Sequence, residues 1–303
     1  MDIAVIGSNM VDLISYIDRM PKEGETLEAL DFKMGCGGKG SNQAVAAARL
    51  ESNVMMVSKV GDDLFGENTI KNFKNNGINT EFVTIEKNKP SGVAPIFVDK
   101  ESKNSILIIK GANKSLCPKD IDNASEKLKK CSLIILQLEI ELETVYYAID
   151  FANKNNIPIL LNPAPATKEL DFSYVCKCDF FVPNETELEI LTNKHVTTLD
   201  EIKEAAYFIA NKGVKNVIVT MGSKGLFWIN KHEEQFINSK QVNAVDTTGA
   251  GDAFIGCFAH YYVATKNILL ALEKATVYAA LSVTKYGTQS SYPTKEQFEK
   301  FLK

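Results

Sequence analysis

The chain has 303 residues, of which 45% are hydrophobic and 24% charged, and its formal net charge is −4. This length is sufficient for one large α/β domain or two smaller domains. Basic and acidic residues are interleaved and no basic face stands out, so the composition argues against binding to nucleic acid or to an anionic membrane surface.

Short apolar runs typical of β-strands alternate with amphipathic helical patterns along the chain. Strands are predicted over residues 3–6, 54–57, 133–136, 158–161, 180–182 and 217–220. Helices are predicted between them, over residues 42–50, 67–76, 142–153 and 199–211. This alternation favours a mostly parallel central sheet with helices on both faces. The N-terminus reads as a strand rather than a signal peptide, and the longest uncharged apolar stretch, 253–264, is too short to span a bilayer.

Two regions do not fit this alternation. Residues 13–34 show alternating patterning with no intervening helix, and residues 93–98 and 105–109 resemble a hairpin around residues 99–102. Folded together, these pieces could form a small β lid over one edge of the main sheet. No linker-like stretch divides the chain, so we expect a single domain over residues 1–303, with a discontinuous lid at approximately 13–36 and 91–110.

Polar segments follow the predicted strands at several points. They cover residues 7–12, 137–139, 162–164, 184–187 and 220–225. Ligands of open α/β sheets gather at the carboxyl ends of the strands, so these segments are expected to meet at one rim.

Residues 35–40, Gly-Cys-Gly-Gly-Lys-Gly, formally match a dinucleotide-binding glycine pattern. That fingerprint should follow the first strand, which ends at Gly7, and the segment does not match a P-loop either. A close backbone approach to a small polar ligand fits better, with Lys39 as a donor. The alternative is a packing turn between the lid and the next helix.

Two further carboxylates have alternative interpretations. Asp12 follows a Gly-Ser-Asn run and could accept hydrogen bonds from the vicinal hydroxyls of a sugar, or it could be a solvated loop residue. Asn184 and Glu187 lie three residues apart at a predicted helix start. They could cap that helix, or hold a hydrated magnesium ion near phosphates. Spacing alone leaves both alternatives open.

Residues 246–254 combine a small-residue turn with a carboxylate. Gly249, Ala250 and Gly251 let the backbone approach an anion, and the apolar residues that follow predict a buried helix. The free N–H groups at the start of such a helix favour a phosphate. Asp252, in its first turn, could accept a proton from a nearby hydroxyl, although aspartate is also a common helix cap. These parts are those needed to transfer a phosphoryl group to an alcohol.

The cysteines give no sign of a disulfide framework or a zinc site. The six cysteines are scattered, with no Cys-x-x-Cys pair, and the three histidines are far apart. A reduced, cytoplasmic environment is expected. Cys131 and Cys257 lie in apolar runs and are expected in the core, whereas no role is assigned to Cys176 and Cys178.

Five segments, in their order and spacing, resemble the ribokinase (PfkB) family of sugar kinases. They are residues 37–44, 162–165, 184–187, 246–252 and 287–293, and the resemblance runs from Ile3 to Pro293. It implies a ribokinase-like α/β fold whose β lid pairs between the subunits of a homodimer. It also implies ATP, Mg²⁺ and a monovalent cation such as K⁺ as cofactors.

The resemblance implies a role for each matching position. Asp252 would deprotonate the primary hydroxyl of the sugar, and Gly249, Ala250 and Gly251 would form the anion hole for the phosphoryl group. The sugar would contact Met10, Val11, Asp12, Gly38, Lys39, Gly40, Ser41, Asn42 and Glu139. ATP would contact Asn184, Thr220, Met221, Gly222, Ser223, Lys224, Gly225, Gly251 and Thr276, with Mg²⁺ held through water at Glu187. The monovalent cation would lie near Asp246, Thr248, Ser282, Lys285, Gly287 and Ser291.

Met10 bears on the choice of sugar. Bacterial members that phosphorylate ribose usually have Asn at this position, and an apolar side chain suits a sugar that lacks a hydroxyl, since a buried unpaired amide costs about 1–3 kcal/mol. Eukaryotic members resemble the chain at Met10, so ribose is not excluded. We expect an ATP-dependent kinase acting on the 5-hydroxyl of 2-deoxy-D-ribose ahead of D-ribose. The alternatives are a nucleoside or fructose-type kinase of the same fold, and a non-catalytic sugar-binding regulator.

Overall fold

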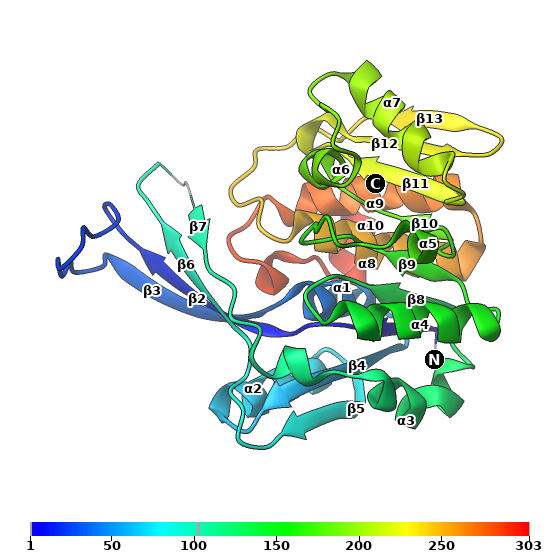
Figure 1. The fold of residues 1–303 in the computed structure, drawn as a ribbon. Coiled ribbons are helices and arrows are strands. Elements are labelled where there is room, and N and C mark those ends of the chain that lie inside the picture. Colours follow the sequence, from blue (N-terminus) through cyan, green and yellow to red (C-terminus); the bar gives the residue numbers. More distant parts are fainter. Residues whose placement is uncertain (1, 102–103, 303) are drawn as a thin grey trace.

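The computed structural model describes residues 2–101 and 104–302 (Figure 1). Its main body contains a nine-stranded sheet with the strand order β13-β12-β11-β10-β9-β8-β1-β4-β5. Neighbouring strands from β11 to β5 are parallel, and β12 and β13 are antiparallel. The expected mostly parallel α/β architecture is confirmed. The strands are β1 Ile3–Ile6, β4 Val54–Gly61, β5 Asn79–Glu86, β8 Leu133–Leu136, β9 Ile159–Leu161, β10 Phe180–Phe181, β11 Asn216–Thr220, β12 Leu226–Asn230 and β13 Glu234–Ile237.

Helices cover both faces of this sheet. Side chains alternate along β1, so Ile3 and Val5 join one apolar core while Ala4 and Ile6 join the other. The helices of the first core are α1 Lys39–Arg49, α2 Leu64–Asn75, α8 Ala250–Thr265, α9 Ile268–Ser282 and α10 Lys295–Leu302. Those of the second are α3 Pro118–Leu128, α4 Leu142–Lys154, α5 Phe172–Val175, α6 Glu185–Thr192 and α7 Leu199–Ala210. Cys131 and Cys257 are buried in these cores, as expected.

All six predicted strands are present with small shifts of their ends, but three strands escaped prediction. In β5 and β13, polar residues break the apolar run, because these strands lie at the two edges of the sheet and are only partly buried. β12 is buried but antiparallel to its neighbour, and only a short 3-10 turn, Gly222–Lys224, separates it from β11 in the sequence. The strict alternation of strand and helix therefore fails at this end of the sheet.

A second sheet, with the order β3-β2-β6-β7, projects from one side of the main body (Figure 1). Its strands are β2 Met10–Tyr16, β3 Asp31–Gly37, β6 Val93–Val98 and β7 Asn104–Ile106. β6 and β7 are antiparallel, as expected of a hairpin, although β7 is shorter than the predicted strand at 105–109. Ser102, in the predicted turn, lies outside the described residues. We call these four strands the lid sheet; the division of the chain into one domain with a lid stays a prediction.

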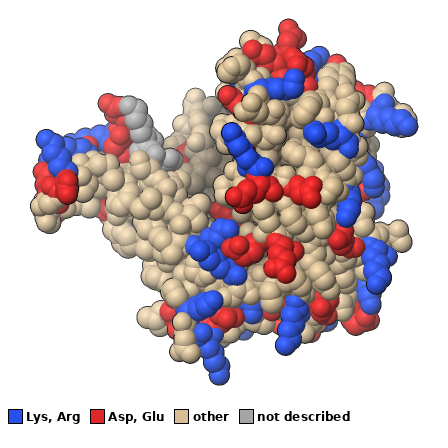
Figure 2. Space-filling view, in the orientation of Figure 1, with Lys and Arg blue, Asp and Glu red and all other residues tan. Residues whose placement is uncertain are grey.

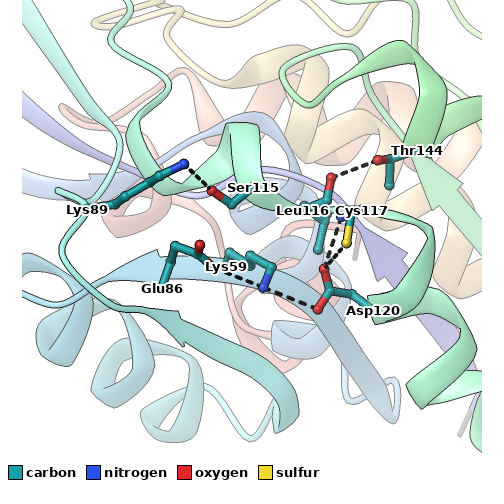
Figure 3. Close-up of polar contacts among 8 residues, drawn as sticks. All are labelled: Lys59, Glu86, Lys89, Ser115, Leu116, Cys117, Asp120 and Thr144. Atoms are coloured by element: carbon teal, nitrogen blue, oxygen red, sulfur yellow. Dashed lines mark hydrogen bonds and ion pairs between the residues drawn. The ribbon is translucent and has the colours of Figure 1, made fainter.

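A partly buried ion-pair cluster joins the β4–β5 edge of the main sheet to α3 (Figure 3). Lys59 Nζ on β4 lies 3.1 Å from Glu86 Oε2 on β5 and 3.3 Å from Asp120 Oδ1 on α3. Asp120 also accepts a hydrogen bond of 3.0 Å from the backbone N–H of Cys117, at the start of the helix. We refer to Lys59, Glu86 and Asp120 as the β4–α3 cluster.

Charges of both signs are interspersed over the face shown in Figure 2, which agrees with the expectation that no basic face exists there. Across residues 2–101 and 104–302, no helix is both long and apolar enough to cross a membrane.

Candidate active site

Two adjoining cavities lie at the carboxyl ends of the central strands, where the polar segments were expected to meet. The larger has a volume of about 440 Å³ and lies between residues 220–226, residues 239–247 and α9. The smaller, of about 170 Å³, is lined by Lys39, Asn162, Glu187 and Asp252 among others. Both cavities share Asn184, Thr220, Thr247, Ala250 and Gly251. A ligand in one cavity can therefore reach a ligand in the other beside the first turn of α8.

Gly249 forms the sharp turn that begins α8. It is the N-cap, with φ of 75°, a left-handed conformation that favours glycine. A Cβ at this position would lie 2.3 Å from Thr288 Cγ2 and 2.6 Å from the Tyr292 hydroxyl oxygen. The turn aims the start of the helix at the smaller cavity, where its N–H groups favour negative charge.

Asp252, in the first turn of α8, lines the smaller cavity and is only 7% exposed. Its Oδ1 accepts a hydrogen bond from Gln43 Nε2 at 2.8 Å, and its Oδ2 accepts one from Asn42 Nδ2 at 2.9 Å. Burial raises the pKa of Asp252, while Lys39 and these two amides oppose that shift. A buried carboxylate with two donors beside a cavity has the properties of a general base.

Lys39 brings a buried positive charge to the same cavity. Burial opposes its charge, but Asp252, Glu139 and Glu187 outweigh that effect and raise the pKa of Lys39. The backbone N–H of Lys39 donates a hydrogen bond of 2.9 Å to Glu139 Oε2, which also accepts one of 2.6 Å from Ser8 Oγ. The first turn of α1 is thereby fixed against the segment that follows β1.

Asp12 lies on β2 of the lid sheet, with Met10 and Ile14 on the same strand face. Met10 packs with Ala94 and Ile96 of β6, so the nearest side chains on this face of the sheet are apolar. Burial, then the charges of Glu139 and Asp252, raise the pKa of Asp12 to about 7. The loop interpretation of Asp12 was therefore wrong, since the residue is in a strand and only 8% exposed.

The glycines between the lid sheet and α1 permit close backbone contacts. A Cβ on Gly37 would lie 2.3 Å from the carboxylate oxygens of Asp12, and one on Gly38, whose φ is 86°, would lie 2.7 Å from the Met10 backbone nitrogen. The next residues are also buried: the Gly40 N–H donates to Ser8 Oγ at 3.2 Å, and Ser41 Oγ accepts from Gln289 Nε2 at 2.8 Å. Val11, on the opposite face of β2, is 3% exposed.

Asn184 and Glu187 cap α6. The Asn184 side chain accepts a hydrogen bond from the Glu187 N–H at 2.8 Å, and Glu187 Oε2 accepts one from the Asn184 N–H at 2.9 Å. The capping interpretation of this pair is therefore confirmed. Both residues also line the smaller cavity, and burial raises the pKa of Glu187, so capping does not remove them from the site.

The residues assigned to ATP by resemblance divide into two groups. Thr220, Gly222, Ser223, Gly225 and Thr276 line the larger cavity. Met221 and Lys224 instead line a separate neighbouring cavity of about 370 Å³. Met221 is 3% exposed, and Lys224 Nζ lies 2.9 Å from Glu185 Oε1.

The residues assigned to a monovalent cation surround the segment before α8. Asp246 joins two loops, because its Oδ1 accepts from the Thr248 N–H and its Oδ2 from the Gly287 N–H, each at 2.9 Å. The hydroxyl of Ser282 donates to Ala279 O and that of Ser291 donates to Thr288 O. Lys285 and Ser291 line a further surface cavity.

Three buried amides near Asp252 escaped the sequence analysis as site residues: Gln43, Gln137 and Gln289. They are linked to the site over long sequence separations, such as the bonds from Gln43 to Asp252 and from Gln289 to Asn42. The only local signal was their proximity to glycine-rich or strand-end segments. Residues 239–244, which line the larger cavity, follow β13, a strand that was also missed.

The comparisons with known proteins agree with this geometry. A model of the pfkB family of carbohydrate kinases matches residues 1–295, and the chain belongs to that family. It is 64% identical over 302 residues to a deoxyribokinase of Salmonella typhi, covering 100% of this chain and 99% of the relative. It is 39% identical to a ribokinase of Mus musculus, covering 97% and 92% of the two chains.

Solved structures show the same fold. A ribokinase of Arabidopsis thaliana complexed with ribose and ATP superposes with a TM-score of 0.93 at 30% identity, covering 100% of this chain and 98% of that one. A ribokinase of Thermotoga maritima gives a TM-score of 0.90 at 36% identity, covering 99% of both chains. The expected ribokinase-like fold is therefore confirmed over the full length.

Proposed function

We propose that the chain transfers the γ-phosphoryl group of ATP to the 5-hydroxyl of 2-deoxy-D-ribose, and that D-ribose is a second substrate. The observation that carries this proposal is the position of Asp252 in the smaller cavity, next to Ala250 and Gly251, which line both cavities at the start of α8. The extensive identity with a deoxyribokinase supports the choice of sugar.

In the proposed step, the sugar extends from the smaller cavity towards Asp12 of the lid sheet, and ATP lies in the larger cavity. Asp252 takes the proton of the 5-hydroxyl as that oxygen forms a bond to the γ-phosphorus. The bond from the γ-phosphorus to the bridging oxygen breaks, and ADP leaves with the electron pair. The N–H groups of the first turn of α8 stabilise the negative charge that develops on the phosphoryl oxygens.

Mg²⁺, when bound, would neutralise phosphate charge. Protein sites for this ion often use one or two carboxylates with waters and substrate phosphates. Glu187 and Asn184, at the edge shared by ATP and the sugar, fit such a hydrated ion. The loops joined by Asp246 would hold a monovalent cation such as K⁺ through backbone oxygens.

The lid sheet supports the preference for the deoxy sugar. Next to Asp12, this face carries an apolar cluster in which Met10, Ala94 and Ile96 pack together. A ribose 2-hydroxyl against this surface would lose its water without gaining a partner, which costs about 1–3 kcal/mol. Asp12 remains available for the hydroxyls that both sugars share.

D-ribose as the main substrate is the second candidate, because the chain also resembles ribokinases over nearly its whole length. A non-catalytic sugar-binding protein is disfavoured, since such a protein has no need for a buried base beside an anion-binding helix start.

Steady-state kinetics on a panel of sugars tests this proposal. ADP release would be measured with 2-deoxy-D-ribose, D-ribose, a hexose and a nucleoside, with and without K⁺, and the phosphorylated position would be identified by NMR. We expect the highest kcat/KM for 2-deoxy-D-ribose, with phosphate on the 5-oxygen. A higher value for a hexose or nucleoside, or sugar binding without ADP release, would refute it.

The proposal includes a cytoplasmic homodimer that pairs through the lid sheet. The lid face opposite Asp12 carries exposed apolar side chains, with Phe32 56% exposed and Met34 54% exposed. Figure 2 shows the body of the lid largely without charge, with charged residues gathered near its tip. An exposed apolar sheet of this kind is typical of a surface that is covered by a partner.

A further inference from the structure

We propose that Gln43, which the sequence did not assign to the site, is a positioning residue that orients the Asp252 carboxylate and holds it in the ionised form. This inference rests on the proposed role of Asp252 as the base. Gln43 lies in α1 and is fully buried, and the residues that line the smaller cavity include Asp252 but not Gln43. It therefore reaches the carboxylate from the protein interior and leaves the cavity side free.

The hydrogen bonds of Gln43 have a defined direction. Its Nε2 donates to Asp252 Oδ1 at 2.8 Å and to Asn162 Oδ1 at 3.2 Å. Its Oε1 accepts from Gln137 Nε2 at 2.7 Å. An ionised carboxylate can only accept hydrogen bonds, so Asp252 requires the nitrogen of Gln43 to face it, and the oxygen must then face Gln137.

Gln137 supplies the donor that this direction requires. It follows β8, is fully buried, and its Oε1 has no hydrogen-bond partner among the described residues. That oxygen lies against the backbone of Gly7 and Gly40, so close to Gly7 that a Cβ there would come within 2.0 Å of it. Reversing the amide would place the Gln137 oxygen against the Gln43 oxygen. The series of hydrogen bonds from Gln137 through Gln43 to Asp252 is therefore compatible with an ionised Asp252 carboxylate.

A second arm holds the other carboxylate oxygen. Asn42 Nδ2 donates to Asp252 Oδ2 at 2.9 Å, and Asn42 Oδ1 accepts from Gln289 Nε2 at 2.9 Å. With one amide on each oxygen, rotation of the carboxylate is restricted, and lone pairs remain for a substrate hydroxyl. Asn42 is also expected to contact the sugar, so a change at Asn42 would affect both positioning and sugar binding. A change at Gln43 tests positioning alone.

The hydrogen bond from Gln43 should change the pKa of Asp252 in one direction. A donor to the ionised form lowers the pKa of a carboxyl group, whereas burial raises it. Removing the Gln43 donor should therefore raise the pKa of Asp252, so that the base becomes protonated over a wider range of acidic pH. Loss of a purely structural contact would lower activity without moving this titration.

The test is the pH profile of Gln43→Met, a variant of similar size that lacks the amide. We would measure kcat/KM for 2-deoxy-D-ribose at saturating ATP from pH 5 to pH 9. We expect the acidic limb to move to higher pH by about one unit, so that the loss of kcat/KM approaches about tenfold at the acidic end and diminishes at high pH. Sugar affinity, measured by calorimetry without ATP, should stay near the wild-type value.

Two further variants keep the test decisive. Gln137→Met should move the limb in the same direction by a smaller amount, and it decides the matter if Gln43→Met does not fold. Asn216→Ala is the matched control. Asn216, in β11, donates a hydrogen bond to Asp179 O and accepts one from Trp228 Nε1. Loss of its side chain should lower Tm without moving the pH profile.

An unmoved acidic limb in both glutamine variants would overturn the inference, as would an equal loss of activity at every pH. Its failure can be distinguished from failure of the proposed function. If Asp252→Asn keeps normal turnover, Asp252 is not the base. If Asp252→Asn is inactive while Gln43→Met has the wild-type profile, only the positioning role is wrong.

Discussion

Asp12 carries a negative charge into an environment that opposes it. The residue is 8% exposed, and burial together with Glu139 and Asp252 raises its pKa to about 7. Near neutral pH the carboxyl group is therefore partly protonated before sugar binds. A carboxyl group in this condition stores an energetic cost that the hydroxyls of a bound sugar can relieve by donating hydrogen bonds.

The pH dependence of stability follows from the sign of this shift. The folded pKa of Asp12 lies above its ordinary value of about 3.8. Proton uptake therefore stabilises the folded state fully below about pH 4, and that contribution is lost as the pH rises through about 7. Asp12→Asn has no proton to lose. Relative to wild type, this variant should gain about 2–3 kcal/mol more in unfolding free energy at pH 8 than at pH 5.

Urea unfolding at the two pH values measures this difference. Asp62→Asn, at an exposed aspartate, is the control and should show little change between them. If Asp12→Asn changes the unfolding free energy equally at pH 5 and pH 8, the pKa of the Asp12 carboxyl group is not raised in the folded protein.

At the scale of single residues, local pattern predicted some of the site and missed the rest. Asp252 could be singled out because a glycine turn and an apolar helix surround it in sequence. Gln43 and Gln137 could not, because the bonds that give them significance join residues 209 and 94 positions apart. An isolated buried glutamine has no sequence pattern that distinguishes it from a surface residue.

The two glycines at the start of α8, Gly249 and Gly251, differ in their backbone conformation and surroundings. Gly249 has a positive φ and close neighbours, whereas a Cβ at Gly251 would have no heavy atom within 4 Å. Gly251→Ala should therefore fit and, by the helix preference of alanine, raise stability by about 0.5–1 kcal/mol. Its methyl group would intrude on the space that both cavities share, so kcat/KM for ATP should fall about tenfold or more.

Thermal unfolding and ATP kinetics on the same preparation check this prediction. Gly249→Ala provides the contrast, because its strained turn should lose stability and activity together. Unchanged ATP kinetics in Gly251→Ala would mean that the turn does not hold the phosphate.

The β4–α3 cluster stabilises one end of the main sheet. Lys59 contacts Glu86 and Asp120, and the side chains of Lys59 and Asp120 are 13% and 11% exposed (Figure 3). Lys59→Met would leave a mostly buried carboxylate without its partner and should lower the unfolding free energy by about 1–3 kcal/mol. Lys127→Ala, which removes an exposed pair with Glu81, should cost less than about 1 kcal/mol. Equal effects in urea unfolding would contradict the importance of burial here.

At the scale of elements, prediction was most successful for strands whose side chains are all apolar. The fully apolar strands in the centre of the sheet were identified because both of their faces are buried, as in β1 and β8. The edge strands β5 and β13 carry polar residues on their exposed sides, so their patterns are weak. The structure of the lid sheet also depends on long-range pairing, since β2 pairs in parallel with β6, about eighty residues later in the chain.

The whole molecule is expected to be a dimer through the lid sheet. Sedimentation should give twice the mass of one chain. Phe32→Asp, which places a charge on the exposed apolar lid face, should give monomers, whereas Leu64→Asp, at a residue 74% exposed in α2, should leave the dimer intact. A monomeric wild-type protein at micromolar concentration would contradict lid pairing.

The proposed reaction depends most on a single carboxylate at the rim of the sheet. Asp252 lines the smaller cavity in the first turn of α8, next to residues that both cavities share, and both of its oxygens are held by amides. Asp252→Asn keeps the size of the side chain and removes its capacity to accept a proton. The most direct measurement is therefore the turnover of 2-deoxy-D-ribose by this variant, alongside its sugar affinity. We predict a folded protein that binds sugar near the wild-type level, with kcat reduced by about 10²–10⁴. Turnover at the wild-type rate would contradict the account.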